Sequence, residues 1–301
     1  MTNTVGKFIG LTGLWLLCVS PTAAADYGHQ ATIQLLDDSA GPTSIASFSI
    51  SYTGYLSNVK TDTGPYLEAA FINPVSHFAV ELNSSDASVT LGPAIVFSTE
   101  SVIRKINYTH VNAGGDITFG LGIDQGDTTL TNNSIKVYDA DSQTITLQFG
   151  LYFDKFSYLS FSLVQNKLSS PGGIASDYTT TSSDISWRQL QLTANQTATL
   201  WEFGVISTVK TYEDSSSNPN ESTTHFQFSW SRFLDRKTGL GGALDYVISD
   251  EQDDEGLNLT LRGSYFVRDD ILMALEYTQF LAGNTGVEDG TTTVLEMSAR
   301  F

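Results

Sequence analysis

The chain has 301 residues, of which 41% are hydrophobic, and a formal net charge of −18. Such an acid excess disfavours binding to nucleic acid, so we expect no nucleic-acid partner. The only cysteine, Cys18, lies within residues 1–25, so a disulfide-stabilised scaffold is excluded for residues 26–301.

The amino-terminal segment has the composition of a secretory signal peptide. Lys7 precedes an apolar run from Phe8 to Val19, and Ala23-Ala24-Ala25 resembles a small-residue cleavage site. The apolar run is too short to cross a membrane as a helix. We therefore expect residues 1–25 to be a cleaved signal peptide and residues 26–301 to form one domain.

Beyond residue 25, apolar and polar residues alternate with a period of two. The pattern is clear at 117–124, 145–151 and 257–262, and it predicts strands with one apolar and one polar face. No segment has a helical period. Counted back from the carboxyl terminus, the predicted strands are 28–37, 44–55, 65–73, 76–84, 87–98, 101–110, 115–124, 143–152, 157–166, 184–193, 198–211, 223–233, 239–249, 256–266, 271–281 and 291–301.

Two regions interrupt this pattern. Gly92-Pro93 breaks the alternation, and if 84–110 is one long outer loop, the count of about 16 strands falls to about 14. The apolar phase also changes between Trp187 and Leu190, which predicts a β-bulge.

The connections between predicted strands are of two kinds. Short ones follow Tyr152, Phe233 and Phe266, whereas longer polar ones cover 125–142, 167–184, 214–223 and 250–255. Short periplasmic turns and longer outer loops are typical of bacterial outer-membrane proteins, and the flanking aromatics would form an interfacial girdle. We therefore predict an all-β fold, a transmembrane antiparallel up-and-down β-barrel in the outer membrane, surrounded by lipid and lipopolysaccharide.

Strand parity predicts which side chains face lipid. Leu147, Phe149 and Leu259 are expected to face outward, whereas Gln148, Asn258 and Arg262 are expected to face the interior.

The last predicted strand carries an assembly signal. Leu295, Met297, Ala299 and Phe301 share one parity, and the chain ends on an aromatic residue. The last strand of a barrel must pair with the first to close the sheet. This pattern resembles the signal that the barrel-assembly machinery reads, so we expect that machinery to be a partner.

Residues 63–73, Thr-Gly-Pro-Tyr-Leu-Glu-Ala-Ala-Phe-Ile-Asn, resemble the G-P-L-x-E-A-A-F-L region of the general porin family of Gram-negative outer membranes. The hairpins at 150–153 and 263–266 are similar to later hairpins of that family. The resemblance implies an outer-membrane barrel with passive passage of solutes, and it supplies no catalytic residue.

Charged residues on the interior parity are the candidates for a pore lining. They are Glu68, Glu81, Glu202, Asp245, Arg262, Glu276, Glu296 and Arg300. Because carboxylates predominate, the field of the lumen should favour small cations over anions. The alternative for each residue is a hydrated wall position without a role in selectivity. A homotrimer is compatible with this class of protein.

We therefore predict an outer-membrane porin, a passive diffusion channel for small hydrophilic solutes, with cation preference. The alternative is a non-conducting barrel that displays outer loops for adhesion or envelope anchoring. No enzyme and no cofactor are expected, because the histidines lack metal-ligand spacing and no nucleophile motif occurs. A third and weakest hypothesis is a barrel enzyme, in which His225 would act together with serines on the interior face. The acidic run 250–255 is interpreted as a solvated outer loop, not a calcium site.

Overall fold

The computed structural model describes residues 26–91, 94–132, 135–170, 177–193, 197–212, 220–250, 254–281 and 290–301. The predicted signal peptide, Gly92-Pro93 and residues 251–253 of the acidic run lie outside these residues. The strands are β1 (Asp26–Ala40), β2 (Thr43–Lys60), β3 (His77–Leu91), β4 (Ala94–Val111), β5 (Ile117–Asn132), β6 (Ile135–Asp154), β7 (Ser157–Ser169), β8 (Tyr178–Leu192), β9 (Ala198–Tyr212), β10 (Glu221–Phe233), β11 (Thr238–Ser249), β12 (Asp254–Arg268), β13 (Ile271–Leu281) and β14 (Gly290–Arg300).

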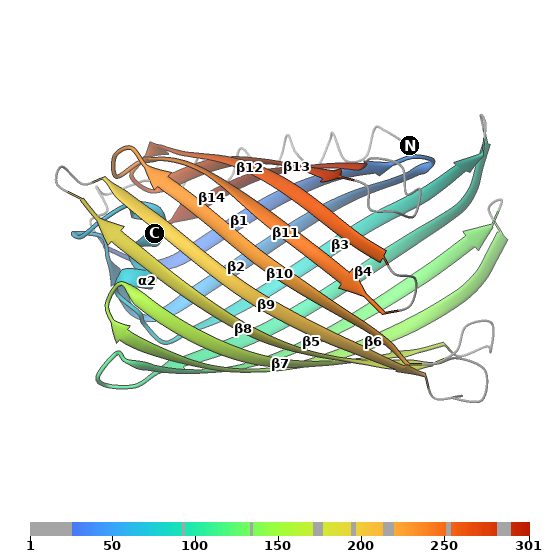
Figure 1. Ribbon diagram of the computed structural model, residues 1–301, viewed down its shortest axis with the longest axis horizontal. Coiled ribbons are helices and arrows are strands. Elements are labelled where there is room, and N and C mark those ends of the chain that lie inside the picture. Colours follow the sequence, from blue (N-terminus) through green and yellow to red (C-terminus); the bar gives the residue numbers. More distant parts are fainter. Residues whose placement is uncertain are drawn as a thin grey trace.

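These strands form one closed barrel in which each strand pairs with its sequence neighbours, and β1 pairs with β14 (Figure 1). The closing register runs from Gln30 opposite Arg300 to Ala40 opposite Gly290. Phe301 continues this pairing, since its backbone N–H donates to the His29 carbonyl at 3.0 Å and its carbonyl accepts from the His29 N–H at 2.8 Å. The sheet therefore has no free edge.

Side chains alternate between the two faces of this wall. Leu147 and Phe149 are 43% and 50% exposed on the outside, and Leu259 also faces outward. Gln148, Asn258 and Arg262 line interior cavities. The predicted register of these two strands is confirmed, and the outside carries the apolar band that a lipid-facing barrel requires. None of the helices described is long and apolar enough to cross a membrane.

The prediction of about 16 strands was wrong, and the alternative of 14 is the observed number. The reason given for the alternative was also wrong, because 84–110 is not a loop. The three strands predicted at 76–84, 87–98 and 101–110 are two longer ones, β3 and β4. Their pairing continues through Arg104 and Lys105, because Arg104 reaches Asp127 on β5 while Lys105 reaches Glu81 on β3.

The predicted strand at 65–73 is absent from the wall. Its residues form a 3₁₀ turn, η1 (Tyr66–Glu68), and a short helix, α2 (Ala69–Ile72), inside the barrel. The alternation at 65–73 is weak, and Glu-Ala-Ala favours helical geometry over a strand.

The predicted outer loop at 125–142 is mostly strand. β5 continues to Asn132 and β6 begins at Ile135, so this hairpin, like the β3–β4 hairpin, reaches far out at the end of the barrel away from the carboxyl terminus (Figure 1). The cross-strand pairing satisfies backbone groups here although the side chains are polar.

The predicted bulge between Trp187 and Leu190 is also absent, because β8 pairs in one continuous register with β7 and β9. Leu190 has interior parity and is 2% exposed. Its apolar side chain breaks the sequence pattern because it packs against another segment inside the barrel, described below.

Replacing Phe149 by Arg tests this wall directly. An Arg on the lipid face near the bilayer midplane should cost about 2–4 kcal/mol, whereas Gln148→Arg, on the interior, should be tolerated. We expect Phe149→Arg to reduce outer-membrane yield and the heat-modifiable folded band, while Gln148→Arg folds like wild type. Equal yields for both variants would show that the assigned faces are wrong.

Candidate functional site

The connection between β2 and β3, residues 61–76, folds into the barrel and is called the plug segment here. Figure 1 shows α2, its helix, at the same end of the barrel as the carboxyl terminus. Gly64 begins the inward turn with a φ of +74°, and a Cβ there would lie 2.6 Å from the Ile72 Cδ1. A residue with a side chain would therefore be unfavourable at this position for both backbone and steric reasons.

Apolar contacts hold the plug segment against the wall. Phe71 and Ile72 pack with Leu190, Leu200 and Phe233, all buried side chains on the interior of β8, β9 and β10. On the other side, Ala69 packs with Tyr27 and Val59, from β1 and β2. Strands of the lumen wall normally present polar side chains inward. The interior apolar residues at this end therefore mark a contact surface for the plug segment.

The aromatics that flank the short connections belong to the same surface. Tyr152 lies 5.7 Å from Phe71, ring centroid to ring centroid, and Phe266 lies 5.6 Å from Tyr66. Phe233 and Phe266 are buried. The prediction that Tyr152, Phe233 and Phe266 form a lipid-facing girdle is therefore wrong, because these rings face the interior and cover the plug segment. The adjacent residues Phe153 and Tyr265 have the opposite parity, and their side chains are exposed on the outside of the barrel.

A buried ion pair fixes the centre of the plug segment. The Glu68 Oε2 lies 2.6 Å from the Arg188 Nη2, and the Arg188 Nε lies 2.9 Å from the Glu202 Oε1. Glu68 is 4% exposed. The Arg188 guanidinium also lies 4.5 Å from the centre of the Phe71 ring. One cation thus serves two carboxylates and an aromatic face, so loss of Arg188 would remove the direct ion-pair partner of a buried carboxylate.

Two further arginines hold the backbone at Tyr66. The Arg300 Nη1 donates to the Tyr66 carbonyl at 2.6 Å, and the Tyr66 N–H donates to the Arg236 carbonyl at 2.9 Å. The Arg236 guanidinium lies 4.4 Å from the centre of the Tyr66 ring and donates to the Gly64 carbonyl at 3.2 Å. The closing strand β14 and the β10–β11 turn therefore both secure the plug segment.

The structure separates the predicted pore-lining residues into two groups. Glu81, Glu202, Asp245, Arg262, Glu276, Glu296 and Arg300 lie on interior positions of the wall strands, between outward-facing neighbours. Glu68 is inside the barrel but on the plug segment, not on a strand. Arg262 lies 3.6 Å from Glu296 and opposite Glu276 in the β12–β13 register. Whether these residues act on permeating solutes stays a prediction.

The predicted assembly residues lie on the closing strand. Leu295 is exposed on the outside, Met297 and Ala299 pair with β1 and β13, and the Phe301 ring stacks on His29 at 5.5 Å. Their recognition by assembly machinery stays a prediction.

Sequence reasoning missed several interior charges. Lys105 lies 3.3 Å from Glu81, and Asp184 lines a cavity of about 590 Å³ with Glu202 and Asp245. Arg188 was missed because it lay in the expected bulge, although its parity with Ser186 and Asp184 was readable.

Within the described residues, no three His, Cys, Asp or Glu side chains form a group able to hold a metal ion.

His225 lies 3.3 Å from the Asp245 Oδ2, measured from its Nδ1, and Asn258 donates to the same oxygen at 3.3 Å. This contact is an interior hydrogen-bond network. Among the described residues, His225 makes no hydrogen bond to a serine hydroxyl.

Glu68 predicts a pH dependence of plug docking. Burial raises the pKa of Glu68 above its ordinary value, against the opposing effect of Arg188. Protonation of Glu68 therefore favours docking of the plug segment. Its contribution to the docking free energy is complete below the ordinary glutamate pKa and is lost as the pH rises through the raised pKa of docked Glu68. We expect hydrogen exchange in residues 66–72, corrected for intrinsic rates, to become faster relative to the barrel as pH rises.

Glu68→Gln should remove most of this pH response, because the amide cannot ionise. Glu276→Gln is the matched control, an interior carboxylate outside the plug contacts. An unchanged pH response in Glu68→Gln would contradict the assignment.

No protein-family model and no curated protein matches the chain. Solved structures do match it. The Pseudomonas putida toluene transporter TodX is 11% identical, with a TM-score of 0.61 over 95% of this chain and 91% of that one. The CymD monoaromatic hydrocarbon channel is 8% identical, with a TM-score of 0.58 over 91% and 89%. A loop-deletion form of OmpT, a Vibrio cholerae outer membrane protein, is 10% identical, with a TM-score of 0.50 over 92% and 100%. At these identities the likeness shows the fold: a closed β-barrel of the kind found in bacterial outer-membrane proteins.

Proposed function

We propose that this protein is an outer-membrane channel for small hydrophilic solutes that is closed at one end by the plug segment and opens when that segment moves. The observation that carries the proposal is the polar interior leading to the plug. A cavity of about 590 Å³ in the lumen shares Ser186 and Glu202 with a second cavity of about 470 Å³ against the plug segment. A solute in the lumen therefore reaches the plug along one polar wall.

The chemistry of that wall favours hydrophilic solutes. Asp184, Gln227, Ser229, Asp245 and Asn258 contribute polar groups to the first cavity, which apolar residues such as Ala243 and Phe280 also line. Two structural neighbours are described as a toluene transporter and a monoaromatic hydrocarbon channel. An apolar solute would gain little by leaving water for hydroxyls and carboxylates, so we do not carry the hydrocarbon over to this chain.

The charge of the wall supports cation preference. The described interior strand positions carry carboxylates at Asp38, Glu81, Asp124, Asp184, Glu202, Glu221, Asp245, Glu276 and Glu296, against the cations Lys105, Arg188, Lys210, Arg262 and Arg300. Four of these cations, Lys105, Arg188, Lys210 and Arg262, are engaged by carboxylates of the plug or wall. Carboxylates left in excess in a narrow lumen raise the local concentration of small cations.

Location follows from the same features. The exposed apolar band suits the outer membrane, where the closing strand β14 would be read by the barrel-assembly machinery. This placement is part of the proposal.

The plug segment also favours a second candidate, a non-conducting barrel that displays its outer loops. If the segment never leaves its site, the lumen has no exit at this end. The two candidates differ only in whether the plug moves, so a variant that loosens it distinguishes them.

Arg188→Ala is that variant. It removes the cation paired with Glu68 and leaves that carboxyl buried beside Glu202 with only the unpaired influence of Arg262 and Arg300, so plug docking should weaken. In planar bilayers we expect wild type to show brief openings and Arg188→Ala to stay open for a larger share of the time. Lys105→Ala is the control, an interior cation paired with Glu81 away from the plug. Folded Arg188→Ala protein without current would favour the display barrel.

Open channels should pass K⁺ in preference to Cl⁻. The preference should be strong at ~0.01 M salt, where the screening length is about 30 Å, and weak at ~1 M, where it is about 3 Å. Zero-current potentials under a salt gradient measure this ratio. A neutral or anion-selective potential at low salt would contradict cation preference without contradicting the channel.

A further inference from the structure

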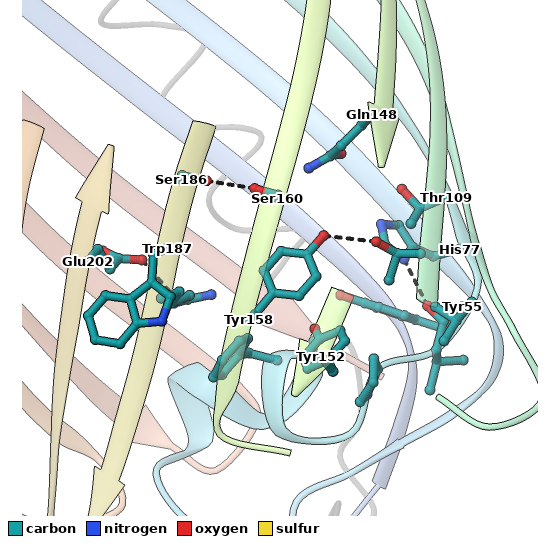
Figure 2. Close-up of a pocket in the computed structure, with 17 residues that line it drawn as sticks. Tyr55, His77, Thr109, Gln148, Tyr152, Tyr158, Ser160, Ser186, Trp187 and Glu202 are labelled. Atoms are coloured by element: carbon teal, nitrogen blue, oxygen red, sulfur yellow. Dashed lines mark hydrogen bonds and ion pairs between the residues drawn. The ribbon is translucent and has the colours of Figure 1, made fainter. Parts of the chain in front are cut away.

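The cavity against the plug segment is built from two parts of the chain. Its volume of about 470 Å³ falls in the usual range for small-molecule sites, about 300–1,000 Å³. The plug segment contributes Ala70, Phe71, Pro74 and Val75 to its lining. The wall residues that line it include Gln148, Tyr152, Tyr158, Ser160, Ser186 and Glu202 (Figure 2). The cavity exists in this form only while the plug is docked.

No free charge is available in this cavity to recognise an ion. Arg188 and Glu202 are its charged residues, and they pair with each other at 2.9 Å while Arg188 also pairs with Glu68. An incoming anion would have to displace two carboxylates from one guanidinium. An incoming cation would meet that guanidinium at close range. A charged ligand is therefore disfavoured.

Hydroxyl and amide groups remain available on the wall. The Tyr158 and Thr118 hydroxyls hydrogen-bond to each other at 2.8 Å, as do Ser160 and Ser186 at 2.6 Å. Each such pair keeps a free donor or lone pairs for a ligand. The Gln148 amide lines the cavity and makes no hydrogen bond to another described residue. It offers a donor and an acceptor side by side.

Aromatic faces lie beside these polar groups. The Tyr152 and Tyr158 ring centroids are 4.4 Å apart, and both rings contact Phe71 of the plug. In the view of Figure 2, the Tyr158 ring lies above Tyr152 and below Ser160 and Gln148. Gly150 makes room for this ring, because a Cβ there would collide with the Tyr158 hydroxyl. The negative face of an aromatic ring attracts polarised C–H groups.

We propose that this cavity binds an uncharged cyclic polyol, the chemistry of a monosaccharide ring, and that the bound ring stabilises the docked plug. The ring presents hydroxyls at its edge for Gln148 and the paired hydroxyls, and C–H faces for Phe71 and Tyr158. Since the ligand contacts wall and plug together, it binds the docked state more tightly and shifts the equilibrium toward it. The stabilisation of the docked plug by the ligand rests on the proposed channel function, whereas binding of the ligand to the cavity does not.

Calorimetric titration of the detergent-folded protein tests binding, with glucose as the probe. We expect saturable binding of glucose and much weaker binding of sorbitol, which keeps the hydroxyls but has no ring face. Gln148→Leu and Tyr158→Phe should each weaken binding about three- to tenfold, the effect of one lost hydrogen bond. Gln227→Leu is the matched control, an interior glutamine that lines the other cavity only.

The outcomes separate the site from the channel. Stronger binding of toluene, benzoate or ethanolamine than of glucose would overturn the ligand class. Equal glucose affinity in Gln148→Leu, Tyr158→Phe and wild type would overturn the site. Glucose binding that leaves single-channel open time unchanged would overturn the stabilising effect. Binding that is lost in Gln148→Leu but occurs in a protein without current would support the site and contradict the proposed function.

Discussion

The structure depends on complete pairing of the backbone. In a hydrocarbon environment an unpaired N–H or C=O costs several kcal/mol, so a sheet is stable there only when its first and last strands meet. The β1–β14 ladder and the added pairing of Phe301 with His29 provide that closure. Once the wall is closed, each strand has one outer and one inner face, and side-chain parity decides what the lumen contains.

The inner face is where this chain departs from a simple pore. Leu190, Leu200 and Phe233 place buried apolar groups where a water-filled lumen would carry polar ones. These groups are covered by Phe71 and Ile72, and Arg188 and Arg300 add polar attachments on either side. These two kinds of contact respond differently to pH. The apolar packing does not depend on pH, whereas the contacts of Glu68 change when its carboxyl group ionises. A docked but releasable plug is consistent with this mixture.

Much of the wall was predictable from the sequence because a strand's period is local. From β5 to β14 each predicted strand overlaps an observed one, and Leu147 and Gln148 face the predicted sides. The plug was not predictable in this way. Residues 65–73 were assigned to a strand, since nothing local shows that Glu68 meets Arg188, 120 residues further on. The sequence carries only an indirect signal of the plug: Leu190 and Leu200 have interior parity but apolar side chains. The change of apolar phase between Trp187 and Leu190 was interpreted as a β-bulge, whereas it marks the contact of Leu190 with the plug segment.

The central claim is that the plug segment closes the lumen and that current flows when it leaves. Ala69 is fully buried in the docked plug, and residues 26–301 contain no cysteine, so Ala69→Cys gives a single reporter thiol there. The most direct measurement is the rate at which a membrane-impermeant maleimide modifies Ala69→Cys while the current through the same bilayer is recorded. Modification should be slow in closed periods, speed up in proportion to open time, and leave the channel open. Rapid modification during closed periods, or steady current with the thiol still protected, would contradict the account.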